Sequence, residues 1–187
     1  MFTVNPLGWL EGVRWVPSPN FNQRPRQCDI DMLVVHNISL PPGEFGGPYI
    51  EQFFTNQLEA EEHPYFYEIK DMQVSAHCLV RRTGEIVQFV SLNERAWHAG
   101  QSCWDGRENC NDFSIGIELE GDDESAYEPI QYRQLARLVR SIQAIYPKLT
   151  NQRILGHSDI APDRKTDPGP AFEWPTLRAL IAPDQPE

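Results

Sequence analysis

The segment that decides the fold is FSIGIELE, Phe113–Glu120. Its apolar side chains alternate with a serine, a glycine and two glutamates, and this period of two is typical of a β-strand. One face of the strand is therefore expected to enter a hydrophobic core, while the other face carries Glu118 and Glu120. We interpret Glu120 as a solvated residue of that polar face.

Further strands are indicated on the N-terminal side of this segment. Met32–Val35 is continuously apolar, which predicts a central strand buried on both faces. Val74–Val80 and Glu85–Val90 flank Thr83-Gly84, a pattern that predicts two strands joined by a hairpin turn.

Helical segments alternate with these strands. The apolar residues of Pro129–Ile145 recur at helical spacing, Pro129 suits a first-turn position, and Pro147 ends the helix. Shorter helices are expected at Tyr49–Leu58 and at about Trp174–Ile181. Strands interleaved with helices predict an α/β fold, with a central mixed β-sheet flanked by helices.

Length and charge limit the possible organisation and partners. The 187 residues show no repeat or linker composition, so we expect a single domain over residues 1–187, with a core at about residues 15–181. Asp and Glu number 27 against 16 Lys and Arg, which gives a net charge of −11. An acidic surface repels phosphate backbones and anionic lipid head groups, so nucleic acid and membrane partners are disfavoured.

The compartment is predicted from what the sequence lacks. Its longest apolar runs are of four residues, too short for a transmembrane helix, and the first thirty residues show no secretory signal. The four cysteines form no C-x-x-C pair, and we interpret them as free thiols of a reducing compartment. These features together predict a cytoplasmic protein.

Polar residues at the ends of predicted strands are the first candidates for chemistry, because open α/β sheets place their sites there. His36 closes the most apolar strand, His157 follows a short apolar segment, and Glu118 lies on the polar face of the clearest strand. Each has another interpretation. His36 could be a core histidine and Glu118 a solvated carboxylate, whereas His157 could cap the next helix, although Ser158 or Asp159 would do so better.

These residues could bind one catalytic zinc ion, because such an ion takes three protein ligands and leaves one position for water. Five histidines allow ten pairs and no H-E-x-x-H motif is present, so spacing alone does not select the ligands. Asp167 precedes a proline in a segment expected to be extended, where Lys165 shares its face. An acidic ligand beside an ammonium group suits stabilisation of an oxyanion, while the alternative is an exposed ion pair.

Five motifs in order resemble the AmpD-type 1,6-anhydro-N-acetylmuramoyl-L-alanine amidases, which share a zinc amidase superfamily with phage-lysozyme-type amidases and peptidoglycan recognition proteins. The motifs are VHNIS (35–39), RAWHAG (95–100), NDFSIGIELEG (111–121), GH (156–157) and KTDPGP (165–170). The likeness runs from about Trp15 to Leu180, nearly the whole chain.

The resemblance implies one catalytic zinc ion, held by His36, His157 and Asp167. It also implies that Glu118 activates the attacking water and that Lys165 stabilises the transition state. The expected reaction is hydrolysis of the amide between the lactyl group of muramic acid and L-alanine in anhydro-muropeptides, in cytosolic recycling of peptidoglycan. No protein partner is indicated.

Two other functions are open on the sequence: an exported amidase of the intact wall, and a muropeptide-binding sensor without turnover. The acidic charge and the missing signal oppose the first, and the presence of Asp167 and Glu118 opposes the second.

The substrate contacts are less defined. Asn37, adjacent to His36, could bind substrate, and Trp97 could stack on a sugar ring or pack in the core. Arg107 is our candidate for the carboxylates of the stem peptide, although the sequence does not separate it from Arg82. His63, His77 and His98 are unassigned, with His77 interpreted as structural or as an outer partner of a ligand. The loop 41–48 is either a flap over the site or a rigid, proline-braced loop.

Overall fold

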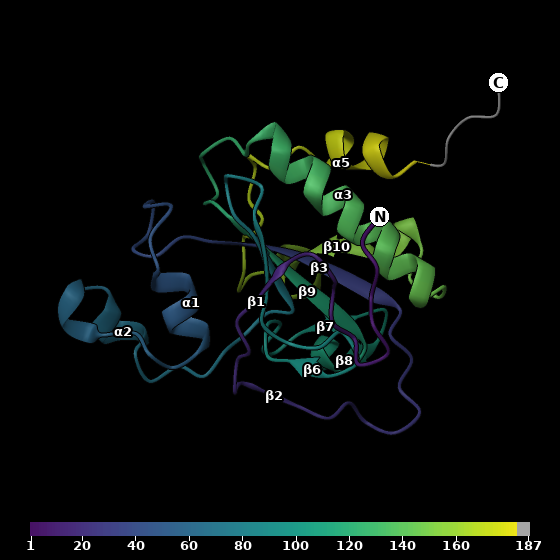
Figure 1. The fold of residues 1–187 in the computed structure, drawn as a ribbon, viewed down its shortest axis with the longest axis horizontal. Helices are drawn as coiled ribbons and strands as arrows, with labels where there is room; N and C mark the ends of the chain where they lie inside the picture. Colours follow the sequence, from purple (N-terminus) through teal and green to yellow (C-terminus); the bar gives the residue numbers. More distant parts are fainter. Residues whose placement is uncertain (183–187) are drawn as a thin grey trace.

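The computed structural model describes residues 1–182, and its centre is a six-stranded mixed sheet (Figure 1). Only β4 and β5 pair antiparallel, and all other neighbouring strands are parallel. The strand order is β1 (Arg14–Trp15), β5 (Ile86–Gln88), β4 (Cys78–Val80), β9 (Ser114–Glu120), β3 (Met32–Ile38) and β10 (Ile154–Gly156). The α/β fold with a mixed sheet is therefore as predicted.

The two long strands, β3 and β9, lie side by side in the middle of this sheet, with His36 opposite Glu118 and Ile38 opposite Glu120. Every residue of β9 is buried, so the interpretation of Glu120 as solvated is wrong: only 2% of it is exposed. The alternation that predicted the strand is real, but both faces of β9 are covered. Its polar face is therefore an interior surface.

Helices α3 (Pro129–Ile145) and α5 (Trp174–Ile181) lie together on one face of the sheet, and both have the predicted bounds (Figure 1). The apolar stripe of α3 packs in one core cluster with Ile115, Ile117 and Leu119 of β9. At the start of α3 the Gln131 side chain accepts the backbone N–H of Glu128 at 2.9 Å, closing half of a capping box.

The other face is covered by the shorter elements α1 (Tyr49–Phe54), η1 (Ala60–Glu62) and α2 (Phe66–Ile69). Their aromatic residues pack on Leu79 and Val87 of the sheet. Helix α1 ends four residues before the predicted Leu58, because the Thr55 hydroxyl bonds back to the carbonyl of Glu51 at 2.7 Å and Asn56 turns to a positive φ of 59°.

Two small antiparallel strand pairs complete the structure beside the sheet: β2 (Phe21–Asn22) with β6 (Arg95–Ala96), and the hairpin of β7 (Cys103–Trp104) with β8 (Arg107–Glu108). The remaining short elements are η2 (Cys110–Asp112), η3 (Asn151–Arg153) and α4 (His157–Ile160). The strand predicted over Val74–Val80 pairs only from Cys78, because the N–H groups of Ser75 and His77 bond to Trp97 and Gly116 before the ladder begins.

Parallel pairing decides where the candidate residues meet. Because β3, β9 and β10 run in the same direction, their carboxyl ends lie at one edge of the sheet. Gly156, the last residue of β10, is opposite Val35, so His157 and His36 follow at neighbouring positions. All four cysteines are free, and no helix within residues 1–182 is long and apolar enough to cross a membrane.

Candidate active site

Three possible metal ligands converge at this edge of the sheet. His36 Nδ1 lies 3.0 Å from His157 Nδ1 and 2.9 Å from Asp167 Oδ2, and His157 Nδ1 lies 3.0 Å from the same carboxylate oxygen. His36 ends the buried part of β3, His157 begins α4, and Asp167 lies in the turn that follows this helix. His36, more than one hundred positions before the other two, thus joins them in one triangle of donor atoms.

The triangle suits a small metal ion such as zinc. Nitrogen and oxygen ligands bind zinc at about 2.0–2.2 Å, so ligands that share one ion are separated by roughly 3.3 Å, close to the spacings here. Burial lowers the pKa of His36 to about 4, which keeps its imidazole neutral at pH 7, as a ligand must be. Two neutral imidazoles and a carboxylate form a donor set that zinc prefers.

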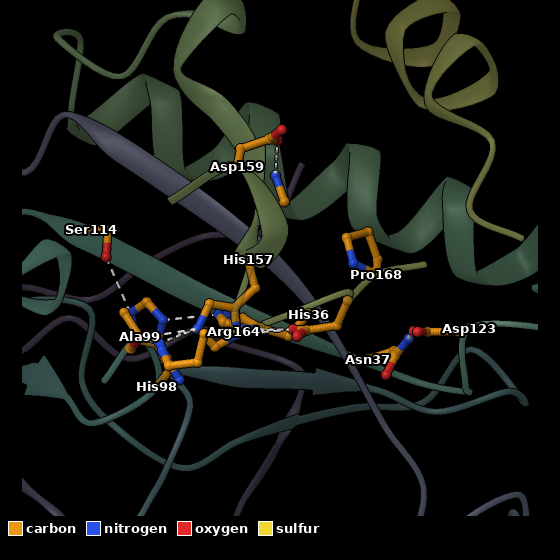
Figure 2. A network of polar contacts seen from close by, with 12 residues as sticks. His36, Asn37, His98, Ala99, Ser114, Asp123, His157, Asp159, Arg164 and Pro168 are labelled. Carbon is orange, nitrogen blue, oxygen red and sulfur yellow. Dashed lines mark hydrogen bonds and ion pairs between the residues drawn. The ribbon is translucent and has the colours of Figure 1, made fainter. Parts of the chain in front are cut away.

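His157 is oriented for this role by contacts away from the triangle. Its Nε2 lies 3.1 Å from the carbonyl oxygen of Ala99 and 3.4 Å from the Arg164 guanidinium. A proton on Nε2 would be donated to the carbonyl, and Nδ1 would then carry the lone pair that a metal ion needs. The alternative role as a helix cap is taken by Asp159, which accepts the N–H of Gly156 at 2.7 Å (Figure 2). The sequence argument that Asp159 is the better cap agrees with this contact.

Glu118 lies beside the triangle, opposite His36 on the neighbouring strand. It is 8% exposed, and among the described residues none donates a hydrogen bond to its Oε2. Burial raises the pKa of this carboxyl well above its usual value, the charge of Asp167 raises it further, and Lys165 opposes the shift. A buried carboxyl oxygen without a donor is costly, and this one is available to a molecule bound in the site.

A cavity of about 330 Å³ opens over these residues. Its polar part is formed at the strand ends by His36, Glu118, His157, Lys165 and Asp167, and its apolar wall comes from α1, α2 and the segment after α2. A cleft with an apolar wall and a few converging polar groups is the usual form of a small-molecule site. The wall residues are Phe53, Phe54, Tyr65, Ile69, Met72 and Val74.

Lys165 and Asp167 both line this cavity, and Asp167 lies in a turn over residues 166–169 that Lys165 directly precedes. The turn is closed by the N–H of Gly169, which bonds to the carbonyl of Thr166 at 3.0 Å. Lys165 is exposed, so its ammonium group is accessible from the solvent side of the cavity.

The predicted substrate contacts divide into two groups. Asn37 and Trp97 line the cavity, where Asn37 Nδ2 donates to Asp123 at 2.8 Å and Trp97 Nε1 donates to Asn22 at 2.9 Å. Arg107 is not among the residues that line this cavity, so its role as a substrate contact stays a prediction.

Each of the two candidate arginines, Arg107 and Arg82, contacts an acidic residue. The guanidinium of Arg107 bonds to Asp31 at 2.7 Å and stacks 3.6 Å from the ring centre of Phe113. Arg82, the alternative, bonds to Glu128 at 2.8 Å and also does not line this cavity.

Sequence reasoning left His98 unassigned, yet its Nδ1 lies 2.9 Å from His36 Nε2 (Figure 2). The motif RAWHAG contained this residue, but nothing local in it shows that His98 faces His36 across the fold. His77 bonds through Nδ1 to the N–H of Gly116, and His63 bonds to the N–H of Tyr65, so neither joins the triangle.

The loop 41–48 contributes Pro42 to the cavity and is held at its far end. The N–H of Gly46 donates to Glu120 at 2.7 Å, and the carbonyl of Gly47 accepts from Arg81 at 3.1 Å. Movement of this loop as a flap therefore requires the loss of a hydrogen bond to a buried carboxylate.

Known proteins similar to this chain are N-acetylmuramoyl-L-alanine amidases. The chain matches the family described as N-acetylmuramoyl-L-alanine amidase over residues 26–170. It is 59% identical over 175 residues to the 1,6-anhydro-N-acetylmuramyl-L-alanine amidase AmpD of Salmonella typhimurium (strain SL1344), covering 94% of this chain and 93% of that protein.

The similar solved structures are also amidases of this kind. A selenomethionine derivative of AmpD superposes with a TM-score of 0.93 at 54% identity, covering 96% of this chain and 100% of that one. The E. coli amidase AmiD, in complex with the substrate anhydro-N-acetylmuramic acid-L-Ala-D-gamma-Glu-L-Lys, matches with a TM-score of 0.59 at 31% identity, covering 95% of this chain and 65% of that one.

Proposed function

The chain belongs to the N-acetylmuramoyl-L-alanine amidase family, and from this premise we propose that it hydrolyses the amide bond between the lactyl group and L-alanine of 1,6-anhydro-N-acetylmuramyl peptides. Identity of 59% over nearly the full length of an AmpD enzyme supports this activity. The observation that carries it within the structure is the convergence of His36, His157 and Asp167 beside the unpartnered carboxyl of Glu118. The place of the reaction is cytoplasmic peptidoglycan recycling.

The cofactor in this proposal is one zinc ion held by His36 Nδ1, His157 Nδ1 and Asp167 Oδ2. When bound, zinc supplies a Lewis acid that polarises the scissile carbonyl and lowers the pKa of water toward about 7. The three ligands arise from two strand ends and a turn, so the sheet itself sets their separation.

Glu118 is the general base in this mechanism. Its Oε2 has no competing donor, so it can accept the proton of the attacking water and return it to the amine of the leaving L-alanine. The positive charge of Lys165 favours the ionised form of Glu118 that this step needs. Burial raises the pKa of Glu118 above its ordinary value, so the carboxyl holds a proton more firmly than an exposed glutamate does.

Lys165 stabilises the charge that develops on the scissile oxygen. Its exposed ammonium group lines the same cavity as Glu118, so it can approach a bound substrate without leaving a buried partner. Asn37 and Trp97 are the proposed substrate contacts, the first by hydrogen bonding and the second by packing of its indole against the sugar.

The substrate proposed is a soluble anhydro-muropeptide. The complex of AmiD with an anhydro-N-acetylmuramic acid peptide supports this chemical class, and the acidic net charge of −11 favours a soluble substrate over the anionic envelope. Amidases of the intact wall and turnover-free sensors are the competing functions.

One experiment separates these functions. Zinc-loaded protein is incubated with an anhydro-muropeptide, with its reduced non-anhydro counterpart, and with intact peptidoglycan, and the products are measured by mass spectrometry. We expect release of the stem peptide from the anhydro-muropeptide. Binding without any release would identify a sensor, and faster release from intact wall would identify an envelope amidase.

A further inference from the structure

Two adjacent residues, His98 and Ala99, contact both histidines of the proposed metal site on the side away from the metal. His98 Nδ1 lies 2.9 Å from His36 Nε2, and the carbonyl oxygen of Ala99 lies 3.1 Å from His157 Nε2 (Figure 2). One short segment between β6 and β7 therefore reaches the outer nitrogen of each ligand. A shift of this segment would turn both imidazole rings together.

The segment is itself held in a single position by Asn111. The Asn111 Oδ1 atom accepts the backbone N–H of His98 at 3.1 Å and that of Ala99 at 2.8 Å. Asn111 is 6% exposed, so water does not compete strongly for these two bonds. The amide of one side chain thus fixes the backbone that supports both ligands.

The ring of His98 is fixed by two further contacts on β9. Its Nε2 lies 3.2 Å from the Ser114 hydroxyl (Figure 2), and its ring lies against the backbone of Gly116. A Cβ atom on Gly116 would lie 2.3 Å from His98 Cγ, so a side chain at position 116 would displace the ring. Gly116 is therefore required for close approach at this point in β9.

These contacts allow one arrangement of protons in which both ligands are ready for a metal ion. A proton on His98 Nε2, donated to Ser114, leaves His98 Nδ1 as an acceptor, and His36 then donates from its Nε2. His157 donates from Nε2 to Ala99 in the same way. Both ligands consequently present an unprotonated Nδ1 toward Asp167, which is the form that binds a metal ion.

We propose that His98 is a positioning residue, which, together with the Ala99 carbonyl and the Asn111 side chain, orients His36 and His157 for zinc. This inference rests on the proposed function, because it assumes that these histidines bind zinc. The part played by His98 is the hydrogen bond that its Nδ1 accepts, and not only the packing of its ring.

A matched pair of variants isolates that hydrogen bond. Asn and Leu are similar in size and both remove the ring from Gly116, but only His98→Asn keeps an acceptor near the position of Nδ1. We expect His98→Leu to bind zinc about 10- to 100-fold more weakly than His98→Asn, in competition with a chelator of known affinity. Equal affinities of the two variants would overturn the proposal, since they would reduce His98 to packing.

A spectroscopic signal tests the same bond independently of turnover. In the zinc-loaded protein, the Nε2 proton of His36 should give a low-field, slowly exchanging resonance with a scalar coupling to His98 Nδ1. The low-field resonance should persist in His98→Asn and disappear in His98→Leu. A coupling that assigns the shared proton to His98 in the wild type would contradict the proposal.

A second pair of variants tests the two hydrogen bonds that Asn111 accepts. Asn111→Asp keeps the oxygen that accepts both N–H groups, whereas Asn111→Leu removes it, so only the latter should weaken zinc binding by a similar factor. Wild-type protein that binds no zinc would overturn both this inference and the proposed cofactor. Wild-type protein that binds zinc, with no difference within either pair of variants, would overturn the inference alone.

Discussion

Glu118 and Glu120 lie two residues apart on the same face of β9 and are both buried, but their surroundings differ. Both oxygens of Glu120 have donors: Oε1 accepts from Gly46 at 2.7 Å and from Arg81 at 3.1 Å, and Oε2 accepts from the N–H of Arg82 at 3.1 Å. Glu118 Oε2 has no donor within residues 1–182.

The contrast shows how one strand supports two roles. A buried carboxylate with all its donors in place ties neighbouring segments together, and here Glu120 joins the loop 41–48 to the sheet. A buried carboxyl that lacks donors retains a lone pair for proton transfer, and burial raises its pKa. The strand pattern is the same at both positions, so the neighbours assign the roles.

The largest effect is expected from the loss of a metal ligand next to Glu118. Asp167→Ala removes one of three converging ligand atoms, so zinc affinity should fall by more than the about 10- to 100-fold typical of losing an outer partner. Turnover should fall to the level of chelator-treated protein. The measurements are zinc content and release of the stem peptide, with His63→Ala as the control. Full activity of metal-free protein would remove zinc from the mechanism.

The next effect separates chemistry from metal binding. Glu118→Gln is nearly isosteric but cannot accept the proton of water, so turnover should fall by about 10² to 10⁴ while zinc is retained. Zinc stoichiometry and kcat are measured on the same preparation. A variant that turns over normally, or one that has lost its zinc, would show that the role assigned to Glu118 is wrong.

Lys165→Ala should have a somewhat smaller effect, a loss in kcat of about 10² with zinc retained, because an oxyanion would lose one stabilising charge. Lys165→Arg keeps a positive charge at the mouth of the cavity and should recover part of the rate. If the alanine variant keeps its kcat and changes only KM, the ammonium group binds substrate without acting in the transition state.

The smallest expected effect on catalysis is that of Glu120→Gln, and it sharpens the contrast with Glu118. An amide leaves the buried guanidinium of Arg81 facing a neutral partner, so the free energy of unfolding should fall by about 1 to 3 kcal/mol. Turnover should stay within roughly tenfold of the wild type. Denaturant unfolding and kcat are the two readouts. Unchanged stability would show that these contacts of Glu120 contribute little to the stability of the fold.

Some elements were predictable because their signals are local. The apolar spacing of α3, with Pro129 in its first turn, gave both of its bounds, and the bounds of α5 were also predicted. The alternation in β9 identified a strand, and the two histidines were placed at strand ends before any contact was known. The choice of His36 and His157 among ten possible pairs came from the family resemblance, since spacing alone does not select them.

Other features depend on contacts between distant parts of the chain. The burial of Glu120 requires a loop from residues 41–48 and an arginine from the turn after β4, so nothing in the strand itself indicates it. His98 reaches His36 from 62 positions away. Arg107 pairs with Asp31, which lies 76 positions away in the sequence.

By itself, the sequence determined the elements with strong local patterns, such as β9, α3 and α5, and, through ordered motifs, the family and its reaction. Periodicity, prolines and turns act over a few residues, so they can be recognised without knowing the fold. Tertiary structure alone decided which polar groups are satisfied and which remain free for chemistry. Those properties depend on the register between β3 and β9 and on the loops that close over their faces.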